Sequence, residues 1–329
     1  EFPSLTRYIL ETRGFGGIAK QYNSPDNSPV LLFLLKSTQW AKPVSIIAMA
    51  LPVRIFLMPT ISGTNAFNAI LHGLEITGIL NGSNLSDTPV WPGINQPFML
   101  FFARNCVPTL NHHFQFVTPH FETSLNDKGR VRIDFQSAQP IAISDVIKDG
   151  ELLKALSIGT VLDVEVLNKL SNLVWPTVKS YWKLHKLYSG LGYNRSPNQI
   201  QSNETFLNSL PDFEPPEQDN FSIDVSSLLK LGPLTAHRPR DPELYISPLL
   251  IVPESPGCSP ITPKSWIVRT PTAFSSSYYG FSGKGCNETD GTIEFLHLIT
   301  HSELFRYYVL MTSSKMGAER RAFLKSNIE

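Results

Sequence analysis

The chain has 329 residues, and its 28 lysines and arginines balance its 28 aspartates and glutamates, so the formal net charge is zero. Charged residues make up 17% of the composition and hydrophobic residues 42%. This apolar content excludes an acidic disordered chain, and the neutral total argues against a simple polycationic nucleic-acid binder. The length allows two domains of ordinary size.

Cysteine usage and hydropathy indicate the compartment. The cysteines Cys106, Cys258 and Cys286 lie far apart, without the CxxC or Cys/His spacing of a zinc site. We therefore expect a reducing, cytoplasmic environment and no metal. No run of about 18 apolar residues predicts a membrane span, so we expect no membrane partner. Six Asn-x-Ser/Thr sequons leave an extracytoplasmic glycoprotein as a minority alternative.

The first hundred residues alternate between helical and extended patterns. A helix is predicted up to Trp40, and a short helix capped by Ser62 or Thr64 follows later. Apolar runs predict strands at 45–51, 75–80 and 97–103. The run at 45–51 is so apolar that we expect it to be covered on both faces. This order of elements is typical of a doubly wound α/β layer.

That layer lacks its beginning. A doubly wound domain usually starts with a strand and a glycine-rich cofactor turn, whereas Gly14-Phe15-Gly16-Gly17 follows a helical stretch. We interpret these glycines as a plain turn. The chain also starts at Glu1-Phe2-Pro3 without an initiator methionine, and we expect it to be cut from a longer protein.

From His112 the pattern changes to an α+β texture. Half-buried strands are expected at 114–117 and 131–135, joined by a turn at 126–129, and later strands at 249–252, 266–269 and 274–281. Helices are expected at 143–156, 160–173 and 291–311. Residues 194–220 are rich in Asn, Ser, Pro and acidic side chains, which predicts an exposed loop.

No complete active site is visible. The chain has no GxSxG elbow and no GxxxxGK[ST] phosphate loop. His112 and His113 are adjacent on a strand and point to opposite faces, so we expect them to be polar strand-end residues rather than metal ligands. His297 and His301 lack the glutamate of an HExxH motif, and we expect them on a helix surface.

The local charge differs from the neutral total. Residues 166–203 hold five basic side chains and no acidic one, interleaved with aromatic residues, and 255–287 is a second acid-free stretch. Basic groups neutralise phosphates, and aromatic and hydroxyl side chains position the nucleic-acid backbone or stack on bases. A neutral chain can therefore carry a basic groove.

Several stretches resemble adenine-N6 DNA methyltransferases that carry a C-terminal target recognition domain, as in type IIG restriction–modification enzymes. They are 22–29 with the helix that follows, 47–54, 91–105, 273–280 and 305–320. The first three are similar to the end of the catalytic domain, and the last two to the closing part of the recognition domain. The resemblance implies the C-terminal half of a doubly wound methyltransferase sheet at 1–118, followed by an α+β target recognition domain at 119–329.

Two motifs of that family are missing. The Phe-x-Gly-x-Gly turn that holds S-adenosylmethionine and the Asn/Asp-Pro-Pro-aromatic motif that clamps the flipped adenine do not occur, and Pro215-Pro216 lies in an acidic loop. The resemblance therefore implies a fragment without catalytic residues. S-adenosylmethionine belongs to the parent enzyme, and this chain alone is expected to bind no cofactor. Its expected partners are double-stranded DNA and the missing N-terminal catalytic half.

The DNA contacts are expected on loops between strands and on the basic stretch. The first candidates are Ser275 to Tyr279 and Lys284, and the next are Thr312 to Lys315; the lysines and arginine between 179 and 195 are expected to contact phosphates rather than bases. The candidate set is Lys179, Lys183, Lys186, Arg195, Ser275, Ser276, Ser277, Tyr278, Tyr279, Lys284, Ser313, Ser314 and Lys315. A non-catalytic DNA specificity subunit is the main alternative, and it would normally lack the α/β half.

Overall fold

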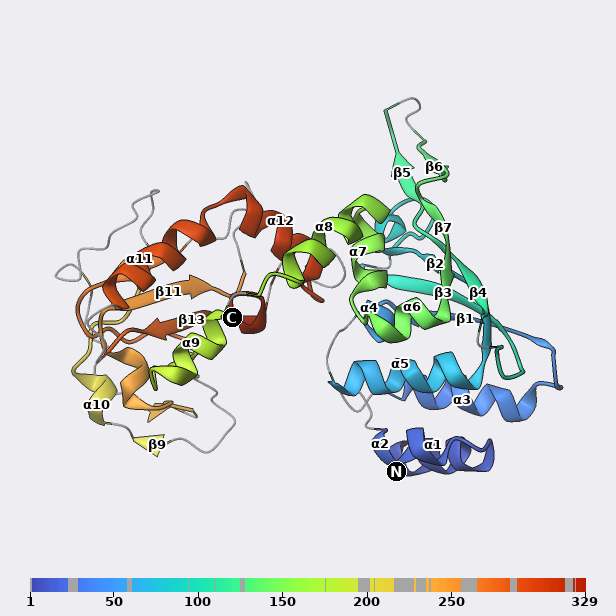
Figure 1. Cartoon of the computed structure of the whole chain (residues 1–329), viewed down its shortest axis with the longest axis horizontal. Coiled ribbons are helices and arrows are strands. Elements are labelled where there is room, and N and C mark those ends of the chain that lie inside the picture. The colour runs from blue at the N-terminus through green and yellow to red at the C-terminus, as the bar shows by residue number, and fades with distance from the viewer. Residues whose placement is uncertain are drawn as a thin grey trace. The chain divides into compact units, whose positions relative to one another are not determined.

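The computed structural model describes residues 2–22, 29–57, 61–93, 95–109, 111–124, 128–174, 176–194, 202–203, 205–215, 228, 235–236, 238–255, 265–284, 289–316, 322 and 324–329. The chain divides into two compact units. Unit 1 contains Glu1–Asn172 and Ser314–Arg320, and unit 2 contains Leu173–Ser313 and Arg321–Glu329. Figure 1 labels the elements of both units.

Unit 1 combines helices with a five-stranded sheet. Its helices are α1 (Phe2–Thr12), α2 (Gly16–Gln21), α3 (Val30–Trp40), α4 (Arg54–Leu57), α5 (Ile61–Gly73), α6 (Ile143–Lys148), α7 (Leu152–Ile158) and α8 (Val161–Ser171), with a 3-10 turn η2 (Ser83–Leu85). Its strands are β1 (Ile46–Pro52), β2 (Glu75–Asn81), β3 (Phe98–Arg104), β4 (His113–Val117), β5 (His120–Glu122), β6 (Arg130–Arg132) and β7 (Ala138–Ala142). The helix up to Trp40, the short helix before Leu71 and the three strands expected in the first hundred residues are present, but Ser62 and Thr64 lie inside α5, which begins at Ile61, and do not cap it.

The sheet is mixed rather than doubly wound. Its strand order is β1-β3-β2-β4-β7. β3 runs antiparallel between β1 and β2, β4 runs parallel to β2, and β7 runs antiparallel to β4. The connection between β2 and β3 is a loop with one 3-10 turn, without the crossover helix that a parallel neighbour needs. The coarser α/β class is confirmed, and the doubly wound arrangement is not.

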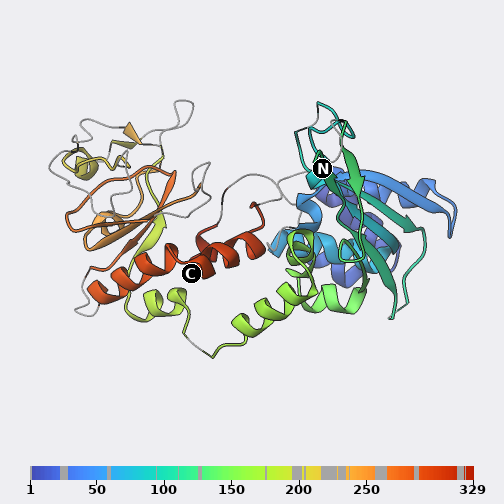
Figure 2. The same ribbon diagram turned by 90° about the horizontal axis from the view of Figure 1, so that it is seen from above.

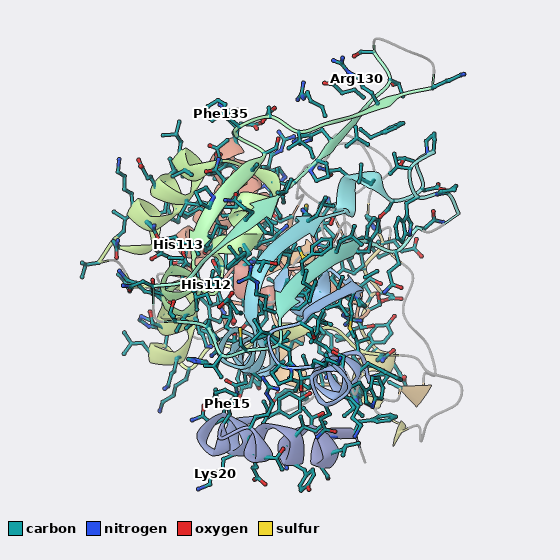
Figure 3. The ribbon with its side chains drawn as sticks, turned by 90° about the vertical axis from the view of Figure 1, so that its right-hand side faces the viewer. Phe15, Lys20, His112, His113, Arg130 and Phe135 are labelled. Atoms are coloured by element: carbon teal, nitrogen blue, oxygen red, sulfur yellow. The ribbon has the colours of Figure 1, made fainter. Side chains whose placement is uncertain are left out.

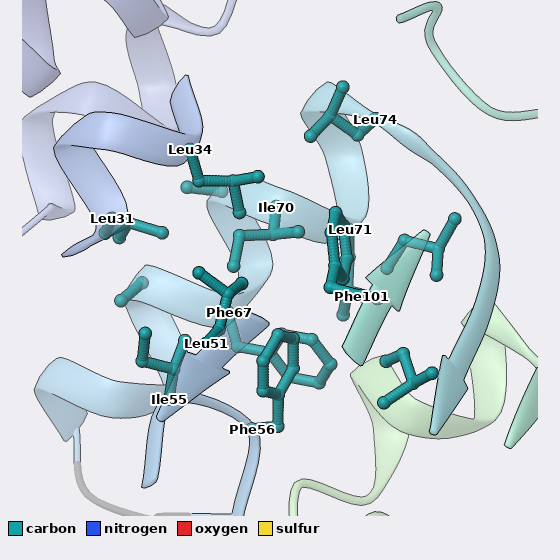
Figure 4. Close-up of a cluster of buried hydrophobic side chains, with 14 of the residues drawn as sticks. Leu31, Leu34, Leu51, Ile55, Phe56, Phe67, Ile70, Leu71, Leu74 and Phe101 are labelled. Carbon is teal, nitrogen blue, oxygen red and sulfur yellow. The ribbon is translucent and has the colours of Figure 1, made fainter. Parts of the chain in front are cut away.

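One continuous apolar core holds unit 1 together (Figure 4). Leu31 and Leu34 of α3 and Phe67 of α5 meet the buried side of β1 and β3, where Phe56 stacks on Phe101 with ring centroids 5.8 Å apart. The helical pattern of α3 and α5 and the alternation of the strands direct these side chains to one layer. The core therefore lies on one face of the sheet.

The opposite face of the sheet is exposed, which corrects the expectation for 45–51. Ile46 is 75% exposed, Ala48 and Ala50 are exposed on the same face of the strand, and Phe102 of the neighbouring strand is 39% exposed. Figure 3 looks onto this side and shows strands in front of the helices. β1 pairs only with β3 among the described strands, so its outer edge is open there. Exposed apolar residues that continue across strands are typical of a surface that another element covers.

The structure places residues 119–172 with unit 1, not with the second unit. β7 pairs with β4 along its whole length, from Val117 opposite Ala138 to His113 opposite Ala142. The predicted 131–135 strand pairs instead with β5, as a short hairpin. The predicted 143–156 helix is divided into α6 and α7, because Asp149 Oδ1 accepts a hydrogen bond from the Glu151 amide at 2.9 Å and closes a turn. The compact units divide after Asn172, and the boundary expected after 118 between a catalytic and a recognition domain stays a prediction.

Unit 2 is built on a four-stranded antiparallel sheet. Its strands are β8 (Ser189–Leu191), β11 (Leu249–Pro253), β12 (Trp266–Val268) and β13 (Tyr278–Ser282), in the order β12-β11-β13-β8, with a separate pair β9 (Ser202–Asn203) and β10 (Thr235–Ala236). Its helices are α9 (Val178–Leu184), α10 (Thr205–Asn208), α11 (Thr289–Thr300) and α12 (Glu303–Thr312), with 3-10 turns η4 (Pro242–Tyr245) and η5 (Lys325–Asn327). α11 packs on β11 and β12 (Figure 2).

Two expectations for unit 2 need correction. The helix predicted at 291–311 is two helices, because Ser302 Oγ accepts a hydrogen bond from the Phe305 amide at 3.1 Å and caps α12. The predicted exposed loop at 194–220 contributes to the core: Leu207 and Phe213 are buried beside Tyr245 and Phe274. Much of that stretch lies outside the described residues.

Candidate nucleic-acid interface

Three of the predicted phosphate contacts lie along α9 and its end. All three are exposed: Lys179 and Lys183, four residues apart, share one face of α9, and Lys186 lies just beyond the end of that helix. Trp182 points inward and meets Phe281 of β13 edge-on, with ring centroids 5.7 Å apart. No carboxylate of the described residues pairs with any of the three lysines. We call these residues the lysine row.

Lys186 ends α9 in an uncommon backbone conformation. Its φ is +54°, in the left-handed region where glycine is favoured. The Leu187 amide donates to the Trp182 carbonyl at 2.9 Å, as in a helix end closed by a left-handed residue. A lysine therefore stands where the backbone favours glycine, and its ammonium group is held beyond the last turn of the helix.

The strand predicted at 274–281 begins only at Tyr278, and Ser275, Ser276 and Ser277 before it form a turn, here called the serine turn, which is bonded to the segment after β8. The Ser276 amide donates to the Tyr193 carbonyl at 2.7 Å, and the Tyr193 amide donates to the Phe274 carbonyl at 3.0 Å. Ser277 is exposed, and Ser275 and Ser276 are half-buried. These three serines lie on a turn that backbone hydrogen bonds position firmly.

The two tyrosines that follow belong to the interior more than to the surface. Tyr279 is buried, and Tyr278 packs edge-on against Phe213 with ring centroids 5.0 Å apart. Burial raises the pKa of Tyr278 above its ordinary value. Their rings stabilise the sheet, and neither presents an open face for stacking on a base.

Lys284 is not a free cation. Its Nζ lies 2.7 Å from a carboxylate oxygen of Glu243 on η4, with both side chains partly exposed. Exposed ion pairs of this kind contribute about 0–1 kcal/mol to the free energy of unfolding, so the contact between Lys284 and Glu243 is weak. A phosphate could replace Glu243 as the partner of this lysine at little cost.

The last three candidates are largely inaccessible. Ser313 and Ser314 are 0% and 2% exposed, and the Ser313 hydroxyl donates to the Ala322 carbonyl at 3.2 Å. Lys315 is half-buried and has contacts of its own. These positions show no hydroxyl surface for DNA. Arg195 lies outside the described residues.

His297 differs from the expected surface histidine. It is buried, and its Nδ1 lies 2.9 Å from the Ser265 hydroxyl, which also contacts Thr300 Oγ1 at 2.6 Å. Burial, with the neighbouring His301, lowers the pKa of His297 to about 4. A neutral imidazole thus joins β12 to α11. No group of three or more metal-binding side chains occurs among the described residues.

In unit 1, no pattern in the amino-acid sequence pointed to Lys154. This lysine on α7 is 1% exposed, and its ammonium group donates to the Met316 carbonyl. Burial lowers the pKa of Lys154 to about 7. The contact joins residues 162 positions apart within unit 1, and its role is structural.

The comparisons with known proteins identify no family. No family model matches the chain, and no curated protein matches it. Among solved structures, the chain is similar to the type IIG restriction endonuclease BpuSI, at 9% identity and a TM-score of 0.35, over 91% of this chain and 41% of that one. It is also similar to the methyltransferase subunit of a type I restriction-modification system from Streptococcus thermophilus, at 11% identity and a TM-score of 0.30, over 39% of this chain and 29% of that one. The chain thus spans less than half of either protein. None of the described helices has the length and hydropathy to span a membrane.

Proposed function

We propose that this chain is part of a site-specific adenine-N6 DNA methyltransferase of a restriction–modification system. In this proposal unit 2 recognises the DNA target, and unit 1 is the end of the catalytic fold. The observation that carries the proposal is the lysine row, a line of three exposed cations with no carboxylate partner among the described residues. Phosphate contacts of this kind supply affinity and fix the register on the duplex.

The serine turn is the second feature that supports DNA recognition, through contacts to bases or sugars in addition to the phosphate contacts of the lysine row. Ser275, Ser276 and Ser277 offer hydroxyl groups that donate and accept hydrogen bonds, and they lie on an ordered turn of the sheet to which α9 packs through Trp182. An ordered turn loses little conformational entropy when it binds. We therefore propose Ser275–Ser277 for contacts to the bases or sugars and the lysine row for contacts to phosphates.

The exposed face and the open edge of the unit 1 sheet support the proposal that another polypeptide segment packs against this sheet. Ile46, Ala48, Ala50 and Phe102 form an apolar surface that has no covering layer among the described residues. We propose that the N-terminal catalytic half covers this face and pairs with β1. It would also contribute the S-adenosylmethionine site and the motif that holds the flipped base, since the chain contains neither motif.

The alternative is a DNA specificity subunit without catalytic fold. Unit 2 alone would suit it, but the mixed sheet of unit 1 would then have no purpose in recognition. The two alternatives differ in one result: a specificity subunit needs no partner for the open face of unit 1.

The test of the DNA proposal uses the full chain and a duplex of mixed sequence. We expect salt-sensitive binding that weakens at least ten-fold when Lys179 and Lys183 are both replaced by Gln. A matched control is the double variant Lys42→Gln and Lys148→Gln in unit 1, which loses the same charge from exposed positions. Equal affinity of the lysine-row variant and the wild type would overturn the assignment. The chain alone should transfer no methyl group from S-adenosylmethionine to DNA.

A further inference from the structure

Arg240 combines a strained backbone with a fixed side chain. It lies between β10 and η4, and its φ is +74°. An arginine gains nothing locally from this left-handed conformation, which glycine adopts freely. Backbone outliers of this kind occur preferentially at functional sites. Within unit 2 the described non-glycine residues with positive φ are Lys186 and Arg240, and both carry a positive charge.

The loop around Arg240 is held by hydrogen bonds at three points. The Arg240 Nε donates to the Gly192 carbonyl at 3.1 Å. The Tyr245 hydroxyl donates to the Pro239 carbonyl at 2.7 Å, and the Asn194 amide donates to the Arg238 carbonyl at 3.1 Å. The guanidinium group is thus oriented by its Nε before any ligand arrives. Such preorganisation lowers the entropy lost on binding.

The anchor of Arg240 belongs to the same segment that positions the serine turn. The Gly192 amide donates to the Tyr278 carbonyl at 3.2 Å, and the next residue, Tyr193, bonds with Phe274 and Ser276 through its backbone. A Cβ at position 192 would lie 2.0 Å from the Phe274 carbonyl oxygen, so the close approach requires glycine. Arg240 and the serine turn are therefore both held by hydrogen bonds to one short backbone segment, Gly192 and Tyr193.

The charges around this loop favour an anionic or acceptor-rich ligand. No carboxylate of the described residues is paired with Arg238 or Arg240. Arg238 is exposed and Arg240 is half-buried. An exposed guanidinium suits a phosphate, whereas a fixed, half-buried one suits a ligand of defined geometry.

We propose that Arg240 is a specificity-determining residue that reads a guanine through its O6 and N7 atoms, with Arg238 on a neighbouring phosphate. Bidentate contact of arginine to guanine is the commonest specific contact in the major groove. The inference rests on the proposed DNA recognition by unit 2 and adds to it a residue and the base that it reads.

The test selects bound sequences from a random duplex library with the full chain. The wild type is expected to enrich sequences with an invariant guanine at one position. Arg240→Gly, which also relieves the backbone strain, should lose that preference by ten-fold or more and leave the other positions unchanged. Arg240→Lys keeps the charge and should lose the preference as well, because an ammonium group lacks the bidentate geometry.

The control is Arg238→Gln, which should weaken binding to all sequences about equally and reduce the salt dependence by roughly one phosphate contact. An Arg240→Gly variant that folds and selects the same sequences as the wild type would overturn the inference and leave the DNA proposal intact. A wild type that binds with salt dependence but enriches no guanine would also overturn it. A wild type without salt-dependent DNA binding would overturn the proposed function itself.

Discussion

Replacement of Lys186 by Gly separates the stability of unit 2 from its proposed affinity for DNA. A left-handed conformation costs a non-glycine residue about 1–2 kcal/mol, and glycine loses about 0.5–1 kcal/mol more chain entropy on folding. With φ at +54° for Lys186, the net expectation is a gain of about 0.5–1 kcal/mol in the free energy of unfolding. For a unit of this size the gain corresponds to a rise of roughly 2–4 °C in Tm per kcal/mol.

The same substitution removes one cation of the lysine row. If Lys186 contacts one phosphate, log K should depend less steeply on log salt, and the magnitude of the slope should decrease by about 0.9. Thermal unfolding and DNA binding at several salt concentrations measure the two effects. Lys186→Ala is the matched control, since it loses the charge and keeps a side chain in the strained conformation. Lys186→Ala should weaken DNA binding as much as Lys186→Gly does, and it should leave the Tm of unit 2 unraised.

Two results would refute this reasoning. A lower Tm for Lys186→Gly would show that the left-handed conformation is not a cost at this position. An unchanged salt slope in both variants, beside wild-type binding to DNA, would show that Lys186 contacts no phosphate.

Four further predictions concern the stability of the two units. The pKa of Lys154 lies near 7 in the folded state and at 10.5 in the unfolded state. Between these pH values the unfolded state binds more protons, so the free energy of unfolding should rise with pH by up to about 1.4 kcal/mol per pH unit. Chemical denaturation at several pH values should show that Lys154→Met abolishes this rise. His297 has a folded pKa near 4, below 6.5, so stability should fall as pH drops from 6.5 to 4, and a wild-type acid limb in His297→Gln would contradict the assignment. Gly192→Ala should destabilise unit 2 by on the order of 3 kcal/mol, because its Cβ would meet a backbone oxygen; Gly291→Ala in α11, where a Cβ meets nothing within 4 Å, should stabilise it by about 0.5–1 kcal/mol.

Local patterns predicted the elements of unit 1 well. The helix up to Trp40 and the strands at 46–52, 75–81 and 98–104 follow from apolar periodicity within a residue or so of the predicted bounds, whereas the predicted cap of α5 at Ser62 or Thr64 does not. Strand direction and the covered face depend on contacts between distant segments. The antiparallel insertion of β3 and the exposure of Ile46 therefore could not be derived from the pattern of each run.

The candidate site shows the same division. The acid-free basic stretch predicted Lys179, Lys183 and Lys186 as phosphate contacts; the structure shows all three exposed, and their contact with DNA stays a prediction. The pairing of Lys284 with Glu243, 41 residues away, and the burial of Ser313 depend on tertiary packing. Arg240 gave no signal in the sequence, because neither its positive φ nor its bond to Gly192 follows from neighbouring residue types.

The most direct test of the central claim is the salt dependence of duplex DNA binding by the full chain and by a variant with Lys179, Lys183 and Lys186 all replaced by Gln. The account predicts that log K of the wild type falls linearly with log salt, and that the triple replacement reduces the slope by about 2.7, or 0.9 for each phosphate contact. Equal slopes in the two proteins, or no binding by the wild type at low salt, would contradict the account.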